Sequence, residues 1–133
     1  MKIGFVNGCF DVLHVGHISL LEFAKGLCDH LVVGIDSDDR VALAKGPSRP
    51  FNNESDRLRM LLALSCVDEV KMFSTDKELT ELVKKTEPDV MVVGSDWEGK
   101  RVMGAEHAKE LKFFRKVNGY STTRILENSF NRR

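Results

Sequence analysis

The sequence predicts an α/β protein with a Rossmann-like, doubly wound, mostly parallel sheet of five strands and helices on both faces. Short runs rich in β-branched apolar residues alternate with segments of helical period, which is typical of a parallel sheet covered by helices. Three of these runs are almost continuously apolar, as strands buried on both faces should be. A chain of 133 residues with 42% hydrophobic composition suffices for one core, so we expect a single domain over residues 1–133.

The strands and helices follow from these two patterns. The expected strands are Ile3–Val6, Leu31–Ile35, Val70–Phe73, Val90–Val93 and the weaker Leu111–Phe114. Apolar stripes at helical spacing predict three helices, around residues 18–28, 58–62 and 79–83. Ser55 or Asn53 is expected to cap the second helix, Asp76 to begin the third and Glu87–Pro88 to end it. The Gly- and Pro-containing segment Ala44–Asn53 is expected to be an irregular loop.

The composition excludes several classes of partner. Twenty basic and twenty acidic residues give a formal net charge of zero, so no overall field attracts nucleic acid or an anionic membrane. No apolar stretch approaches the roughly 18 residues of a membrane span, and no targeting segment is visible, so we expect a cytoplasmic protein. The three cysteines have neither zinc-site nor disulfide spacing, which fits a reducing compartment. For Cys9 we favour a small buried filler over a reactive thiol.

The loop after the first strand, Asn7–His17, is the first candidate site, because ligands of open doubly wound sheets bind beyond the carboxyl ends of the strands. Gly16 lies at the start of the next helix, where the missing Cβ lets a phosphate approach free backbone N–H groups. His14 and His17 are three residues apart and can converge on one anion. Gly8 and Gly16 stand too far apart for a dinucleotide fingerprint. The loop therefore predicts an anion site.

Two alternative motifs are disfavoured. A zincin pair would place its histidines four residues apart with a glutamate between them, so we expect no protein-bound metal at His14 and His17. The run Gly94–Lys100 has the spacing of a phosphate-binding P-loop after a strand. Arg101, however, replaces the Ser or Thr that such a loop needs for magnesium.

Residues 8–17, Gly-Cys-Phe-Asp-Val-Leu-His-Val-Gly-His, resemble the signature of the cytidylyltransferase-like nucleotidyltransferases, and the resemblance extends over nearly the whole chain. Residues 119–125, Gly-Tyr-Ser-Thr-Thr-Arg-Ile, resemble the Ser-Thr-Thr element with which that family opens its last helix and holds the triphosphate. Their hydroxyls are also good helix caps, and cap and phosphate site can be the same thing.

The resemblance implies three groups of site residues. The catalytic group is His14, His17, Lys45 and Arg124. The nucleotide-binding group is Gly8, Cys9, Phe10, Asp11, Gly16, Gly94, Asp96, Ser121, Thr122 and Thr123. The substrate-binding group is Asp11, Arg57 and Trp97. Two of these residues keep a structural alternative, since Asp11 can cap its own loop and Trp97 can fill the core rather than line a base pocket.

Two internal segments resemble different branches of the family. The run Lys45–Pro50, followed by Arg57, is similar to the branch that adenylylates heptose 1-phosphate, in which the matching lysine and arginine face phosphates. The run Asp96–Lys100 is instead similar to glycerol-3-phosphate cytidylyltransferases. Gly104–Glu106 and Tyr120 favour the heptose branch, although the insert that usually precedes the Ser-Thr-Thr element in that branch is shorter here.

The family's reaction is in-line attack by an acceptor phosphate on the α-phosphorus of a nucleoside triphosphate, with release of pyrophosphate. The resemblance implies ATP with heptose 1-phosphate, or alternatively CTP with glycerol 3-phosphate, and Mg²⁺ bound with the triphosphate. A homodimer is implied, and neither nucleic acid nor a membrane is an expected partner. A non-catalytic nucleotide-binding regulatory module is the other alternative, although such a module would be expected to lose the histidine pair or the Ser-Thr-Thr element.

Overall fold

The computed structural model describes residues 1–115 and contains one five-stranded sheet. Its strands are β1 (Ile3–Gly8), β2 (His30–Asp36), β3 (Glu69–Phe73), β4 (Val90–Gly94) and β5 (Glu110–Phe114). The strand order is β3-β2-β1-β4-β5, and every neighbouring pair is parallel. All five predicted strands are confirmed, and each observed strand is one or two residues longer than its apolar run.

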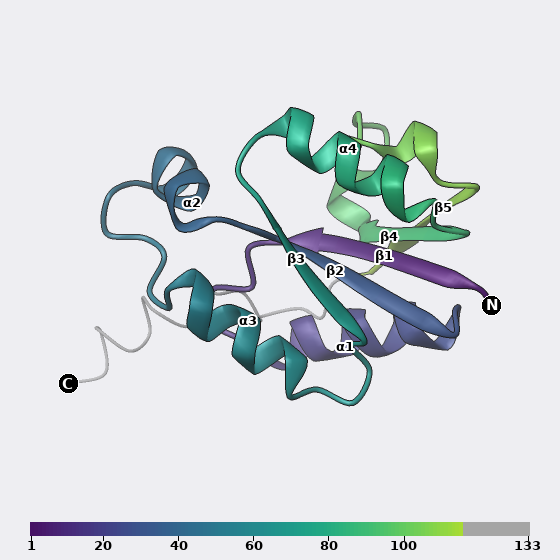
Figure 1. The fold of residues 1–133 in the computed structure, drawn as a ribbon, viewed down its shortest axis with the longest axis horizontal. Helices are drawn as coiled ribbons and strands as arrows, with labels where there is room; N and C mark the ends of the chain where they lie inside the picture. The colour runs from purple at the N-terminus through teal and green to yellow at the C-terminus, as the bar shows by residue number, and fades with distance from the viewer. Residues whose placement is uncertain (116–133) are drawn as a thin grey trace.

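Within residues 1–115, four α-helices connect the strands: α1 (Val15–Gly26), α2 (Asp38–Lys45), α3 (Glu54–Leu62) and α4 (Asp76–Thr86). Figure 1 shows α1 and α3 on one face of the sheet and α4 on the other, with α2 beyond the strand ends. Two short 3₁₀ helices, η1 (Ser95–Trp97) and η2 (Ala105–His107), lie between β4 and β5. The prediction of helices on both faces is therefore confirmed.

Helix α2 is absent from the expected elements, and the loop predicted from Ala44 begins instead at Gly46, the C-cap of α2. The reason is that α2 buries only Val41 and so has no apolar stripe for a periodicity argument to detect. Its local signal is the cap, because the Ser37 hydroxyl accepts a hydrogen bond from the Arg40 backbone N–H at 3.3 Å. The prediction failed here because polar sequence at the strand ends resembles loop sequence.

The two faces of the sheet have separate apolar layers. Leu21 of α1 and Leu61 of α3 pack with Val6 and Val33 on one face. On the other face, the buried residues of α4 pack with alternate residues of the central strands, namely Leu79 and Val83 with Phe5, Val32, Met91 and Val93. Because neighbouring residues of a strand point to opposite faces, β1 supplies both layers from consecutive positions. The central strands are thus buried on both faces, as their continuous apolar runs predict.

The helix ends follow local chemistry. Asn53 caps α3, because its Oδ1 accepts a hydrogen bond from the Asp56 backbone N–H at 2.8 Å. Of the two expected caps, Asn53 and Ser55, the structure therefore contains Asn53. Helix α4 begins at Asp76, as expected, with Thr75 as its cap. Its last residue is Thr86, and the C-cap residue Glu87 has a φ of 48°, which leaves the helical region just before Pro88, as expected.

The topology places a crevice at one edge of the sheet. The chain runs from β1 outward to β2 and β3 and then returns to β4, so the strand order reverses between β1 and β4. At such a switch point the loops after neighbouring strands leave in opposite directions and open a binding crevice at the carboxyl ends. The loops after β1, β2 and β4 therefore share the expected site.

Two glycines in the segment between β4 and β5 provide a matched test of packing. Gly104 and Gly99 have φ values of 86° and 77°, so alanine is strained at both positions. A Cβ on Gly104 would also lie 2.8 Å from Val83 Cγ2, whereas Gly99 faces open space. We expect Gly104→Ala to lower the free energy of unfolding by about 2–4 kcal/mol and Gly99→Ala by about 1 kcal/mol, as measured by urea denaturation. Equal losses would contradict the close contact with α4.

Candidate active site

The first crossover loop makes a tight turn directly after β1. Phe10 has a φ of 51°, in the left-handed region, and its ring is buried. That ring lies against Gly8, where a Cβ would be only 3.0 Å from Phe10 Cε2. The ring of Phe10 also meets the ring of His17 edge-on, with centroids 5.2 Å apart. Gly8 and Phe10 thus shape the backbone from which the histidines project.

His14 and His17 meet at the start of α1. His14 is the N-cap residue, and its backbone N–H donates to His17 Nδ1 at 3.4 Å. The two rings stack with centroids 3.8 Å apart and planes inclined by 21°. Because Nδ1 of His17 accepts this bond, the neutral ring carries its proton on Nε2, which is then a donor. The predicted convergence of the two side chains is therefore what the structure contains.

The helix that follows favours an anion at the same place. Gly16 lies in the first turn of α1, and that turn contains no acidic residue. The N–H groups and partial positive charge of the helix N-terminus therefore meet no acidic side chain from their own first turn. A phosphate group beside the histidine pair would receive backbone and imidazole donors together.

Asp11 has a structural role in this loop. Its buried carboxylate accepts from the backbone N–H groups of Phe51 and Asn52, both at 2.8 Å, and from Arg49 Nε at 2.9 Å. Burial opposes ionisation, but these three bonds together hold the pKa of Asp11 below its ordinary value. The carboxylate faces protein donors and is not exposed, so the direct ligand contact predicted for Asp11 is replaced by the loop-capping alternative.

Arg57 likewise differs from the prediction that it faces a phosphate. It is completely buried, and Nη1 donates to Cys9 O at 2.9 Å and to Asp36 O at 2.7 Å. Nε donates to Asn52 O at 3.0 Å and Nη2 to Asp38 Oδ1 at 2.8 Å. All three nitrogens are therefore committed to the loops after β1 and β2 and before α3. Arg57 is a positioning residue, and local sequence spacing contains no signal for these long-range acceptors.

The loop between α2 and α3 supplies two other basic side chains. Lys45 is exposed at the end of α2, and Lys45 and Cys9 both line a cavity of about 390 Å³. Arg49 Nη2 is buried and has no hydrogen-bond partner within residues 1–115. Burial raises the pKa of the Cys9 thiol despite the nearby charges of Lys45 and Arg57, which favours the filler interpretation over a reactive thiolate.

A cavity of about 400 Å³ lies at the carboxyl ends of β1, β2 and β4. The predicted residues Gly8, Gly94 and Trp97 all line it. Trp97 is 47% exposed, so it is a wall of this cavity and not core filler. Asp96 lies beside Trp97 in η1 but is not among the lining residues.

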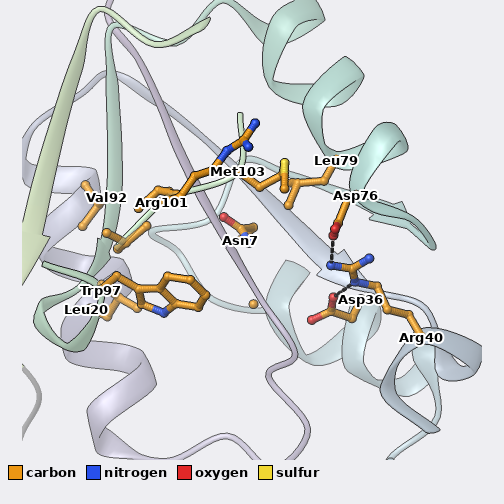
Figure 2. A pocket seen from close by; sticks show the side chains of 14 residues that line it. Asn7, Leu20, Asp36, Arg40, Asp76, Leu79, Val92, Trp97, Arg101 and Met103 are labelled. Carbon is orange, nitrogen blue, oxygen red and sulfur yellow. Dashed lines mark hydrogen bonds and ion pairs between the residues drawn. The ribbon is translucent and has the colours of Figure 1, made fainter. Parts of the chain in front are cut away.

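The same cavity contains an ion-paired cluster that sequence reasoning missed. Arg40 donates from Nε to Asp36 Oδ1 at 2.8 Å and from Nη2 to Asp76 Oδ1 at 2.6 Å, as Figure 2 shows. Partial burial opposes the charge, but the two carboxylates raise the pKa of Arg40. Asp36 ends β2 and Asp76 follows β3, so the strand-end rule alone points to both carboxylates. Arg40 lies in α2, which the apolar pattern does not predict, so the sequence gives no reason to single out its side chain.

Four of the predicted site residues belong to the Ser-Thr-Thr element. Ser121, Thr122, Thr123 and Arg124 lie outside the described residues.

Within residues 1–115, no three His, Cys, Asp or Glu side chains converge in a way that could hold a metal ion. In the same range, no helix is both long enough and apolar enough to cross a bilayer.

The fold and site define the class of protein. A parallel sheet with a switch point between β1 and β4, a glycine-shaped first crossover and an anion-binding helix N-terminus form a nucleotide-binding α/β domain. The family model for cytidylyltransferase-like proteins matches residues 5–128, and the chain belongs to that family. It is a nucleotidyltransferase, as the motif around the two histidines predicts.

Individual relatives agree with this assignment. The chain is 49% identical over 126 residues to the bifunctional protein HldE of Sulfurimonas denitrificans and 50% identical over 122 residues to that of Campylobacter fetus. These alignments cover 95% and 92% of the chain but only 26% of each relative, so the chain spans about a quarter of their length. A lipopolysaccharide core biosynthesis protein from Thermoplasma volcanium superposes with a TM-score of 0.69 at 26% identity, covering 89% of this chain and 99% of that one.

Replacing Asp11 by Asn tests its loop-capping role. We expect Asp11→Asn to lower the free energy of unfolding by about 2–3 kcal/mol, because an amide cannot satisfy the same three donors. The folded pKa is lowered, so this stabilisation is complete above the ordinary value of 3.8 and is lost as the pH falls through the folded value. Urea denaturation of both proteins across this range should show their difference shrinking on acidification. A difference that grows on acidification would refute the assignment.

Arg57 and Arg59 form a matched pair on α3, one buried and one exposed. We expect Arg57→Met to lower the free energy of unfolding by about 3–5 kcal/mol, because it leaves Asp38 and three backbone carbonyls without their donor. Arg59→Met should stay within about 0.5 kcal/mol of the wild type. Thermal and urea unfolding measure the stability of both variants. Similar stabilities would exclude the role of the Arg57 hydrogen bonds in holding the loops together.

Proposed function

We propose that this chain is an adenylyltransferase domain that transfers AMP from ATP to heptose 1-phosphate and releases pyrophosphate. The observation that carries the reaction class is the stacked pair His14–His17 at the N-terminus of α1, beside the switch-point cavity of a cytidylyltransferase-like chain. The acceptor is inferred from the resemblance of Lys45–Pro50 to the heptose branch. Identity of 46–50% to proteins named HldE supports that branch.

The reaction needs charge stabilisation more than it needs a base. The attacking oxygen belongs to a phosphate and is already anionic, so proton abstraction is unnecessary. The protein has to bring two polyanions together and hold them in line. In our proposal, Nε2–H of His17, the ring of His14 and the N–H groups at the start of α1 donate to oxygens of the α- and β-phosphates. Donors fixed before the reaction stabilise charge without having to reorganise.

Basic side chains from two loops complete the proposed phosphate site. Lys45 supplies an exposed ammonium, and Arg49 supplies the buried Nη2 that has no partner within residues 1–115. Arg49 thereby takes the part that the sequence assigned to Arg57, whose nitrogens are already bonded. Ser121–Arg124 remains the proposed second half of the triphosphate clamp. Mg²⁺ enters this proposal as an ion held by the triphosphate oxygens, which is its usual mode in phosphoryl-transfer sites.

We propose that residues 1–133 form one domain that acts in the cytoplasm as a homodimer. The resemblance of Asp96–Lys100 to glycerol-3-phosphate cytidylyltransferases supports CTP with glycerol 3-phosphate as the second candidate. A regulatory module that only binds nucleotide is the third, and the presence of both histidines argues against it.

Replacing His17 by Ala tests the histidine pair. We expect His17→Ala to fold normally and to lose about 10²–10³-fold in kcat, the usual cost of removing one preorganised donor. The matched control is His30→Ala, because His30 lies at the opposite, amino end of β2 and bonds to Glu69. Pyrophosphate release with ATP and heptose 1-phosphate is the measurement. Near-normal turnover by His17→Ala would remove the central claim.

A substrate grid tests the rest of the proposal. Pyrophosphate release is measured with ATP, CTP, GTP and UTP, each against heptose 1-phosphate, glycerol 3-phosphate and phosphocholine. We expect the ATP and heptose 1-phosphate pair to give the highest kcat/KM. A maximum at CTP with glycerol 3-phosphate would establish the second candidate, and no release in any combination would favour the regulatory module.

A further inference from the structure

Asp36, Arg40 and Asp76 form one end of the 400 Å³ cavity, and we call them the carboxylate wall. Arg40 bonds to both carboxylates, and its Cζ atom lies 5.2 Å from the centroid of the buried Phe73 ring. The guanidinium is thus held from three sides, by the last residues of β2 and β3 and by the first residue of α4. Two carboxylates that would otherwise repel each other are held together at the cavity surface.

The charge of the carboxylate wall selects against anions. Two carboxylates and one guanidinium leave a net charge of minus one. Each carboxylate bonds to Arg40 through Oδ1, and within residues 1–115 the side-chain Oδ2 atoms of Asp36 and Asp76 have no hydrogen-bond partner. Carboxylate oxygens accept strongly from hydroxyl groups, whereas a phosphate would be repelled. The ligand chemistry that fits this end is therefore an uncharged, hydroxyl-rich group.

The rest of the cavity is consistent with a ligand of some size. Gly8 and Gly94 line the cavity. Trp97 and Leu20 lie together at the end away from the carboxylate wall (Figure 2). A volume of about 400 Å³ falls in the range of small-molecule sites. Gly8 lines this cavity and also leads into the loop that carries the histidine pair, and Leu20 of α1 lines it as well, so the cavity and the anion site share the first crossover and α1.

We propose that Asp36 and Asp76, positioned by Arg40, bind hydroxyl groups of the acceptor sugar and make the enzyme specific for a polyhydroxylated acceptor. This inference rests on the proposed function, which places the phosphates at the histidine pair. A sugar phosphate that puts its anionic end at the positive end of α1 puts its neutral hydroxyls toward the carboxylate wall. Asp36 and Asp76 are then specificity residues, and Arg40 is a positioning residue.

The ribose of the nucleotide offers the same hydroxyl chemistry, so the experiment separates the two sources. Steady-state kinetics of Asp76→Asn are measured with ATP and heptose 1-phosphate varied in turn. Asp76 is 61% exposed and lies in the first turn of α4, so its replacement should leave the fold intact. The matched control is Asp56→Asn, an exposed acid in the first turn of α3 that is outside the cavity.

We expect Asp76→Asn to raise the KM for heptose 1-phosphate at least tenfold, to change the KM for ATP less than twofold, and to be rescued in part by Asp76→Glu. With an acceptor that lacks a hydroxyl group, the difference in acceptor KM between the wild type and Asp76→Asn should become smaller. A purely structural role of Asp76 would leave that difference unchanged. A rise confined to the KM for ATP would assign the carboxylate wall to ribose and overturn the proposal, as would unchanged constants for both substrates.

A second measurement keeps this inference separate from the proposed reaction. Isothermal titration calorimetry measures heptose 1-phosphate binding to the wild type, Asp76→Asn and Asp36→Asn. Weaker binding by both variants would support the carboxylate wall even if no substrate pair gives turnover. Turnover by the wild type together with equal binding by all three proteins would refute the carboxylate wall and leave the reaction standing.

Discussion

The buried guanidinium of Arg57 is the interaction on which the arrangement of the site depends. A charged group without solvent has to be fully hydrogen-bonded, because an unpaired buried charge costs several kcal/mol. Arg57 meets this requirement with the carbonyl groups of Cys9, Asp36 and Asn52 and the carboxylate of Asp38. These acceptors come from three separate loops at one edge of the sheet. Satisfying one cation therefore determines the relative position of all three loops.

Asp11 extends this constraint to the loop between α2 and α3. Its carboxylate is paired with Arg49 and two backbone N–H groups, so the loop rests on the first crossover. Preorganisation of this kind would favour the proposed reaction between two anions, since donors that must reorganise stabilise less charge. Beside these loops lie the two parts of the proposed site, the histidine pair at the start of α1 and the carboxylate wall at the ends of β2 and β3.

Much of the fold was accessible from sequence because burial imposes local patterns. Strands buried on both faces need continuous apolar runs, and all five were predicted. The convergence of His14 and His17 was equally local, because residues three apart at a helix start lie on the same side. Helix α2 was missed for the complementary reason, since it buries only Val41 and its residues resemble those of a loop. The same omission concealed Arg40.

The sequence by itself determined the sheet, the position of its crevice, the histidine pair and the family. Tertiary structure decided which charged residues line the cavity and which hold the loops. Arg57 and Asp11 belong to motifs that suggest phosphate contact, yet their partners are groups up to 48 residues away. Arg40 and Asp76 meet across 36 residues. Such contacts depend on where the folded chain places carbonyls, N–H groups and carboxylates, and residue spacing along the sequence does not encode those distances.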